Sequence, residues 1–202
     1  MIRYLALGDS YTIGEGIEAA GRWPVLLAAR LREAGIAIAE PRILAKTGWT
    51  TDELAAAMDA AEPLGDRDFV SLLIGVNNQY RGRSVDNYRE EFAALLQRAI
   101  ALTRQRAARV LVLSIPDWGV TPFARRELRS PRRIAQELDA YNATARELCA
   151  AAGVAFVDIT AISRSRTDDM LAEDGLHPSA TQYARWADAA LPVAQGLLAA
   201  TA

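Results

Sequence analysis

After its first methionine, the chain reads IRYLALGDS over residues 2–10. The short apolar run predicts a buried β-strand, and Gly8 allows the backbone to leave the sheet sharply just before Asp9 and Ser10. In an open parallel sheet, ligands bind at the carboxyl ends of the strands. Ser10 is therefore a candidate nucleophile, although a serine after a strand is also a favoured N-cap for the following helix.

Beyond this stretch, strand-like and helix-like patterns alternate to the end of the chain. Further strands are expected at 36–45, 68–74, 109–115 and 154–157, and helices at 23–35, 50–58, 84–105, 131–152 and from 178 to the C-terminus. Thr50 and Glu53 form a capping-box pattern where the second of these helices begins. Five strands separated by helices predict right-handed crossovers, a parallel sheet and a three-layer α/β/α fold, with residues 1–202 forming a single domain.

Composition excludes several classes of protein. The chain has 202 residues, 51% of them hydrophobic, which is enough to bury a sizeable core, and its net charge of −2 gives no field that would attract nucleic acid or an anionic membrane. One histidine and one cysteine, Cys149, supply neither a disulfide nor a usual zinc shell. We expect no cofactor and no metal, so neither EDTA nor a reductant should change activity. No signal peptide or membrane-spanning stretch is visible, so we expect a cytoplasmic location. Composition leaves the oligomeric state open.

The unusual polar residues and a glycine all follow predicted strands. They are Ser10 after the first strand, Gly48 after the second, Asn77 and Asn78 after the third, and Asp174 and His177 after the fifth. The carboxyl ends of parallel strands lie at one edge of the sheet. We therefore expect these residues to come together there.

His177 is the only histidine in the chain. A histidine beside a proline is commonly a solvated loop residue, but here Asp174 lies three residues earlier on a turn that contains Gly175. The carboxylate can accept a hydrogen bond from one ring nitrogen and fix the tautomer. The other nitrogen can then take a proton from Ser10, as an activated hydroxyl requires.

Four blocks of the sequence resemble those of the SGNH hydrolases, also called GDSL-type esterases and lipases. The blocks are Gly8-Asp9-Ser10, Gly48, Gly75-Val76-Asn77 and Asp174-Gly175-Leu176-His177. The resemblance implies a flavodoxin-like five-stranded sheet of order 2-1-3-4-5. It also implies hydrolysis of ester or thioester bonds through an acyl-enzyme.

The same resemblance implies a role for each matching residue. Ser10 would be the nucleophile, His177 the base and Asp174 the group that orients the base. The oxyanion hole would consist of the backbone N–H groups of Ser10 and Gly48 and the side-chain amide of Asn77. A glycine allows close approach of the backbone, and an amide donates without adding charge.

The sequence departs from the family pattern at two positions outside the triad. Tyr11 stands where the family's name has leucine, and Asn78 stands where many members have aspartate. The loop's supporting hydrogen bonds are the feature we expect to differ.

The sequence also bears on two other classes of function. A nucleotide-binding loop is disfavoured because Gly8 and Gly14 enclose five residues and Glu15 replaces the lysine of a P-loop. A noncatalytic carbohydrate-binding or scaffold protein with the same fold stays an alternative. A fluorophosphonate probe distinguishes it from an enzyme.

The substrate is constrained only weakly by the sequence. Trp118, Phe123 and Trp49 are candidates for the substrate pocket, with core packing as the alternative. The basic stretch Arg125–Arg133 is either a solvated surface or a site for a negatively charged group. No long apolar lid is evident, which favours small or short-acyl esters. Carbohydrate O-deacetylation and acyl thioesterase or lysophospholipase activity use the same machinery and stay open.

Overall fold

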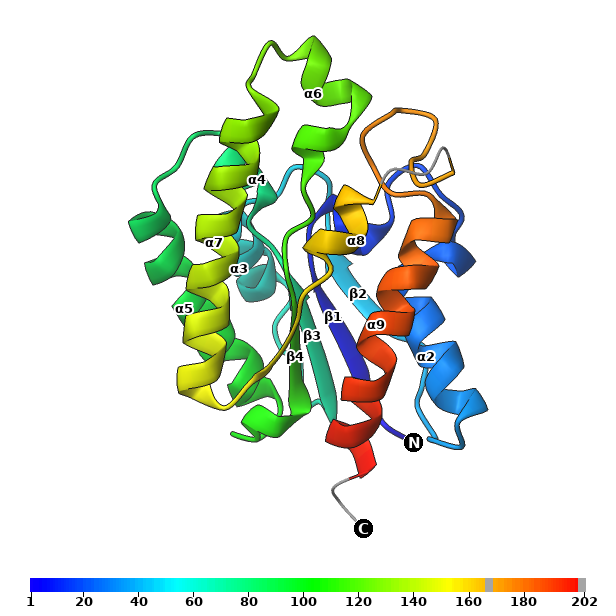
Figure 1. Cartoon of the computed structure of the whole chain (residues 1–202). Helices are drawn as coiled ribbons and strands as arrows, with labels where there is room; N and C mark the ends of the chain where they lie inside the picture. The colour runs from blue at the N-terminus through cyan, green and yellow to red at the C-terminus, as the bar shows by residue number, and fades with distance from the viewer. Residues whose placement is uncertain (166–168, 200–202) are drawn as a thin grey trace.

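The computed structural model describes residues 1–165 and 169–199. Its strands form one parallel sheet of order β2-β1-β3-β4-β5, as predicted. The strands are β1 (Tyr4–Gly8), β2 (Arg42–Ala45), β3 (Phe69–Leu73), β4 (Val110–Leu113) and β5 (Ala155–Val157). Because the chain alternates between strands and helices, every carboxyl end points to the same edge of the sheet, the upper edge in Figure 1.

Helices cover both faces of the sheet. They are α1 (Ser10–Ile13), α2 (Trp23–Glu33), α3 (Thr51–Ala60), α4 (Val76–Tyr80), α5 (Val85–Leu102), α6 (Pro122–Arg126), α7 (Pro131–Ala152), α8 (Thr160–Arg164) and α9 (Ala180–Ala199), with 3₁₀ turns η1 (Ala19–Gly21), η2 (Ala107–Arg109) and η3 (Trp118–Val120). Helices α3, α5 and α7 lie on one side of the sheet, and α2 and α9 pack together on the other (Figure 1). The three-layer α/β/α arrangement is therefore confirmed.

The core lies between the sheet and these two helical layers. All five residues of β1 and all five of β3 are buried, as expected for inner strands of a parallel sheet that is covered on both faces. Trp23 and Leu27 of α2 and Trp186 and Ala190 of α9 are also completely buried. Burial of each large apolar side chain contributes roughly 1.5 to 3 kcal/mol, so this packing holds the inner strands and their carboxyl ends in place.

Two predicted boundaries were wrong. The strand expected at 36–45 begins only at Arg42, after Pro41, which has no N–H to donate to a ladder, and Ile38 pairs with Ile2 through a single isolated bridge. The helix expected to reach residue 105 ends at Leu102. Residues 104 and 105 adopt left-handed backbone conformations with φ of 57° and 61°, and a helix cannot continue through such residues.

The remaining differences are small. The fifth strand begins one residue later than expected, and the last helix begins at Ala180 instead of near Pro178. The prediction that this helix reaches the C-terminus falls partly on residues 200–202, which lie outside the described residues. Within the described ranges, no helix combines the length and the apolar character that crossing a membrane requires.

Candidate active site

Ser10 lies at the carboxyl end of β1, as the first residue of α1. Asp9, and not Ser10, is the N-cap of that helix, because the Asp9 carboxylate accepts a hydrogen bond from the Tyr11 N–H at 3.0 Å. The alternative that Ser10 serves as the cap is therefore wrong. Ser10 is 4% exposed and lines a cavity at the edge of the sheet. Its N–H lies in the first turn of the helix, where backbone N–H groups have no acceptor within the helix.

Asp9 is an unusual cap because it is completely buried. Burial raises the pKa of Asp9 from its usual 3.8 to about 7, against the lowering effect of backbone hydrogen bonds. Its second carboxylate oxygen is buried without a partner among the described residues. In the folded protein this carboxyl group is therefore mainly protonated below about pH 7 and mainly charged above it.

This shift predicts a pH-dependent stability. A raised carboxyl pKa contributes stability that is fully present below the unfolded value and is lost as pH rises towards about 7. Asp9→Asn keeps the cap and removes the titration, so its melting temperature relative to wild type should rise between about pH 4 and pH 8. The expected change is on the order of a few kcal/mol in the free energy of unfolding.

Asp68→Asn is the matched control for this experiment. The hydrogen bonds from Arg3 lower the pKa of Asp68 to about 2, so this carboxyl group is ionised across the whole range tested. Its substitution should destabilise the protein by a nearly constant amount. If the difference in melting temperature between Asp9→Asn and wild type is also constant with pH, Asp9 does not titrate in this range.

Gly48 lies in the loop between β2 and α3, and its backbone conformation explains why a glycine occupies this position. Its φ is +87°, a left-handed value that residues with a side chain rarely adopt. The Gly48 carbonyl accepts a hydrogen bond from the Arg81 guanidinium at 2.7 Å. The Gly48 N–H has no acceptor within the part of the chain that the structure describes. Gly48 is not among the residues that line the cavity containing Ser10.

Asn77 lies just beyond the end of β3, two residues after Gly75, and the packing around Gly75 leaves no room for a side chain. Gly75 has a φ of 128°, and a Cβ there would lie 2.5 Å from the Tyr88 ring. The Asn77 amide donates to the Trp49 carbonyl at 2.9 Å, which ties α4 to the loop that contains Gly48. An amide NH₂ group has two hydrogens, so one is left for another acceptor.

Asn78 points away from the cavity, as predicted, and is completely buried. Its amide oxygen accepts from the Thr51 N–H at 3.1 Å, and its NH₂ group donates to the Thr51 hydroxyl at 2.6 Å. The side chain therefore fastens α4 to the first residue of α3. Its environment is that of a structural residue.

The Asp174–His177 turn has the geometry expected from the sequence. Asp174 Oδ2 lies 2.6 Å from His177 Nδ1, and Asp174 Oδ1 accepts from the N–H groups of Leu176 and His177 at 2.8 and 2.9 Å. Burial would raise the pKa of Asp174, but the hydrogen bonds from the His177 ring and from the two N–H groups outweigh it and lower the pKa. A charged carboxylate therefore holds the imidazole through Nδ1, and Nε2 makes no hydrogen bond within the described residues.

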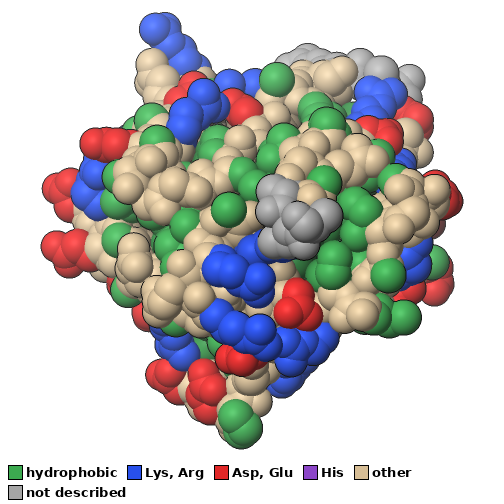
Figure 2. All heavy atoms as spheres, turned by 90° about the horizontal axis from the view of Figure 1, so that it is seen from below, with side chains coloured by type: hydrophobic (Ala, Val, Ile, Leu, Met, Phe, Trp, Pro, Cys, Tyr) green, Lys and Arg blue, Asp and Glu red, His purple; other side chains and the backbone are tan. Residues whose placement is uncertain are grey.

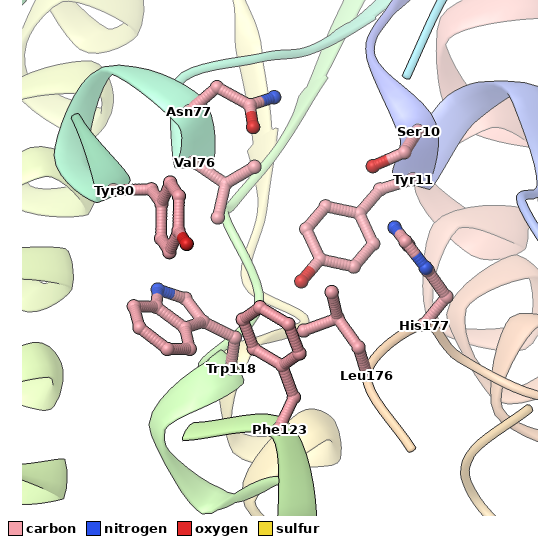
Figure 3. A pocket seen from close by; sticks show the side chains of 9 residues that line it. All are labelled: Ser10, Tyr11, Val76, Asn77, Tyr80, Trp118, Phe123, Leu176 and His177. Carbon is pink, nitrogen blue, oxygen red and sulfur yellow. The ribbon is translucent and has the colours of Figure 1, made fainter. Parts of the chain in front are cut away.

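Segments far apart in the sequence surround one cavity of about 140 Å³ (Figure 3). Its lining consists of Ser10, Tyr11, Val76, Asn77, Tyr80, Trp118, Phe123, Leu176 and His177. In Figure 3, Asn77 and Ser10 lie at one end and Trp118 and Phe123 at the other. Ser10 and His177 make no direct hydrogen bond to each other in the described structure; such contacts are often long in ligand-free sites and tighten with substrate.

The aromatic end of the cavity is fixed by hydrogen bonds. The Trp118 indole N–H donates to Gln79 at 2.8 Å, and Gln79 donates in turn to Glu137 at 2.6 Å. Arg129 lies over the Trp118 ring, 5.3 Å from its centroid, and donates to the Tyr80 carbonyl at 3.1 Å. This wall is therefore preorganised.

Several arginines of the basic stretch Arg125–Arg133 form hydrogen bonds to other residues of the same chain. Arg126 donates to the Asp174 carbonyl at 3.2 Å, and Arg133 donates to Glu137 at 2.8 Å. Together with Arg129, these arginines brace the cavity wall and the turn of the candidate triad. This arrangement supports a structural use of the stretch.

The opposite edge of the sheet carries mixed charge. Figure 2 shows arginine and acidic side chains interspersed there. Arg3, just before β1, pairs with Asp68, just before β3. Arg104, just after α5, pairs with Asp66. Such alternation agrees with the small net charge of the chain.

No described residues form a group of three or more His, Cys, Asp or Glu side chains that could hold a metal ion. Cys149 is buried in α7, and burial raises the pKa of its thiol to about 12. The thiol is therefore not activated as a nucleophile.

The sequence over residues 6–185 matches the family described as GDSL-like Lipase/Acylhydrolase. The chain belongs to this family. It is accordingly a carboxylic ester hydrolase, as the sequence predicted, and a small-molecule substrate is expected of it. Comparison with curated proteins gave no significant match.

Solved structures share the fold of this GDSL-like chain. TesA superposes with a TM-score of 0.76 at 21% identity and covers 97% of this chain and 99% of its own. A lipase/acylhydrolase from Enterococcus faecalis gives 0.74 at 22% identity, with coverage of 98% and 97%. An acetyl xylan esterase from Geobacillus stearothermophilus, Axe2-W215I, gives 0.75 at 19% identity, with coverage of 96% and 94%.

The residues that line the cavity of this GDSL-like chain differ in part from those that the sequence predicted. Four lining residues were not predicted: Tyr11, Val76, Tyr80 and Leu176. Tyr80 lies three residues after Asn77, a helical spacing that could have placed both on one face. Of the three predicted pocket residues, Trp118 and Phe123 line the cavity and Trp49 does not, since its ring packs against the core.

Proposed function

We propose that this protein hydrolyses small carboxylic esters through an acyl-enzyme formed on Ser10. His177 is the base, Asp174 orients it, and the oxyanion hole consists of the N–H groups of Ser10 and Gly48 and the amide of Asn77. The observation that carries the proposal is the meeting of Ser10, Asn77 and His177 in one cavity, although they follow different strands.

The chemistry proceeds in two halves. His177 Nε2 takes the Ser10 proton as Oγ attacks the ester carbonyl, and the carbonyl oxygen becomes an oxyanion bound by the three donors. Collapse of this intermediate expels the alcohol, which receives the proton from His177. Water then attacks the acyl-enzyme with the same proton transfers, which releases the carboxylic acid and regenerates Ser10.

The cavity supports a short acyl or alcohol group. Its volume of about 140 Å³ is below the roughly 300 to 1,000 Å³ of sites that take drug-sized ligands. Apolar and aromatic side chains supply most of the lining, which suits a small, largely apolar group.

A series of p-nitrophenyl esters tests this proposal. The rate constant kcat/KM should be highest for acyl chains of about two to four carbons and should fall with longer chains, because a cavity of about 140 Å³ cannot enclose them. Acetylated sugars and acyl-CoA, measured alongside, test deacetylation and thioester hydrolysis. A noncatalytic carbohydrate-binding or scaffold protein would hydrolyse none of these compounds at a rate sensitive to Ser10→Ala.

A further inference from the structure

Tyr11 follows the candidate nucleophile and differs from the leucine in the family's name. The side chain is 3% exposed, and Figure 3 shows its hydroxyl pointing into the middle of the cavity. Within the described residues, this hydroxyl has no hydrogen-bond partner. A substrate that fills the cavity displaces the water that can pair with this hydroxyl, so a polar atom of the substrate is the natural replacement.

The other polar side chains of the cavity are already committed. The Tyr80 hydroxyl donates to Glu127 at 3.0 Å, and the Trp118 N–H donates to Gln79. Ser10, Asn77 and His177 belong to the proposed catalytic machinery. Among the described residues that line the cavity, Tyr11 therefore has the one polar side-chain group that neither pairs within the fold nor takes part in the proposed chemistry.

The position and the protonation state of Tyr11 are both well defined. Its ring makes edge contacts with His177 and Trp186, at centroid distances of 5.7 and 6.1 Å. Burial, reinforced by the charges of Asp9, Asp117 and Asp174, raises the pKa of the Tyr11 phenol. The hydroxyl is therefore a neutral, rigidly mounted hydrogen-bond donor.

We infer that Tyr11 is a specificity-determining residue: its hydroxyl donates a hydrogen bond to an oxygen atom in the part of the substrate that enters the cavity. The inference rests on the proposed function and narrows its substrate class. Preferred esters carry an ether, hydroxyl or carbonyl oxygen within a few bonds of the scissile ester. A pure hydrocarbon chain leaves the Tyr11 hydroxyl unpaired and is disfavoured.

The test uses Tyr11→Phe, which keeps the ring and removes only the hydroxyl. Two substrate pairs are matched in heavy atoms: p-nitrophenyl methoxyacetate with p-nitrophenyl butyrate, and 2-methoxyethyl acetate with butyl acetate. The first pair varies the acyl group and the second the alcohol. In at least one pair, the variant should lower the ratio of kcat/KM for the ether ester to that for the hydrocarbon ester by about three- to tenfold.

Tyr80→Phe is the matched control, because it removes a cavity hydroxyl that Glu127 already binds. It should leave both ratios unchanged. Tyr11→Leu removes the same hydroxyl independently and should shift the ratio in the same direction as Tyr11→Phe.

Two results would overturn the inference, and they are distinguishable. If wild type hydrolyses the esters but both Tyr11 variants keep the wild-type ratios in both pairs, the role of Tyr11 is wrong and the proposed function stands. If wild type hydrolyses none of the esters, the proposed function fails and the inference fails with it.

Discussion

His177→Ala should lower kcat for ester hydrolysis by on the order of 10⁴-fold or more while the protein stays folded. The chain has no second histidine that could replace the lost base. The His177 ring is held by Asp174 at 2.6 Å and lines the cavity that contains Ser10. Steady-state kinetics on the best p-nitrophenyl ester measure the loss, and melting temperatures establish that the variant is folded.

Added imidazole provides a control for this variant. It should restore part of the rate of His177→Ala, because it can occupy the space of the lost ring and accept a proton. Pyrrole has a similar shape but is not a base, and should restore nothing. Near-normal activity of folded His177→Ala without any additive would show that another group is the base.

Asn77→Ala should lower kcat by on the order of 10²- to 10³-fold, with a smaller effect on KM. The Asn77 side chain lines the cavity with one amide hydrogen available, and an oxyanion donor acts mainly on the transition state. Its hydrogen bond to the Trp49 carbonyl is lost as well, so a modest fall in melting temperature accompanies the kinetic effect.

Asn78→Ala is the matched control, because the two residues are adjacent and chemically identical. It leaves the buried Thr51 N–H without its acceptor, at a cost of about 1 to 3 kcal/mol of stability, while the Thr51 hydroxyl keeps its hydrogen bond to Glu91. We expect it to melt at a lower temperature than Asn77→Ala and to retain most of its kcat. Equal losses of kcat in the two folded variants would contradict a selective role for Asn77.

The parallel sheet could be predicted because the strands are short apolar runs separated by long helices, whereas the strand order followed from the resemblance to the SGNH hydrolases. Residues 4–8 and 69–73 are buried on both faces, and such strands have nearly continuous hydrophobic patterns, interrupted here only by Ser71. Parallel topology then places every strand end at one edge. This is why Ser10, Asn77 and His177 could be expected to lie close together before any coordinates were considered.

The features that were missed depend on contacts distant in sequence. Helices α1, α4, α6 and α8 have four or five residues each, too few to show a helical period. The burial of Asp9 and the free hydroxyl of Tyr11 follow from packing around β1, which no local pattern records. Trp49 could not be placed because a tryptophan beside a loop glycine suits either a cavity wall or the core.

Labelling with a fluorophosphonate tests the central claim most directly, because the probe reacts only with a serine that its own site has activated. The tryptic peptide of residues 4–22 contains Ser10 as its only serine. We predict a single adduct on that peptide in the wild-type protein, no adduct in Ser10→Ala, and much slower labelling of His177→Ala. An adduct on any other peptide, or no adduct on folded wild-type protein, would contradict Ser10 as the activated nucleophile.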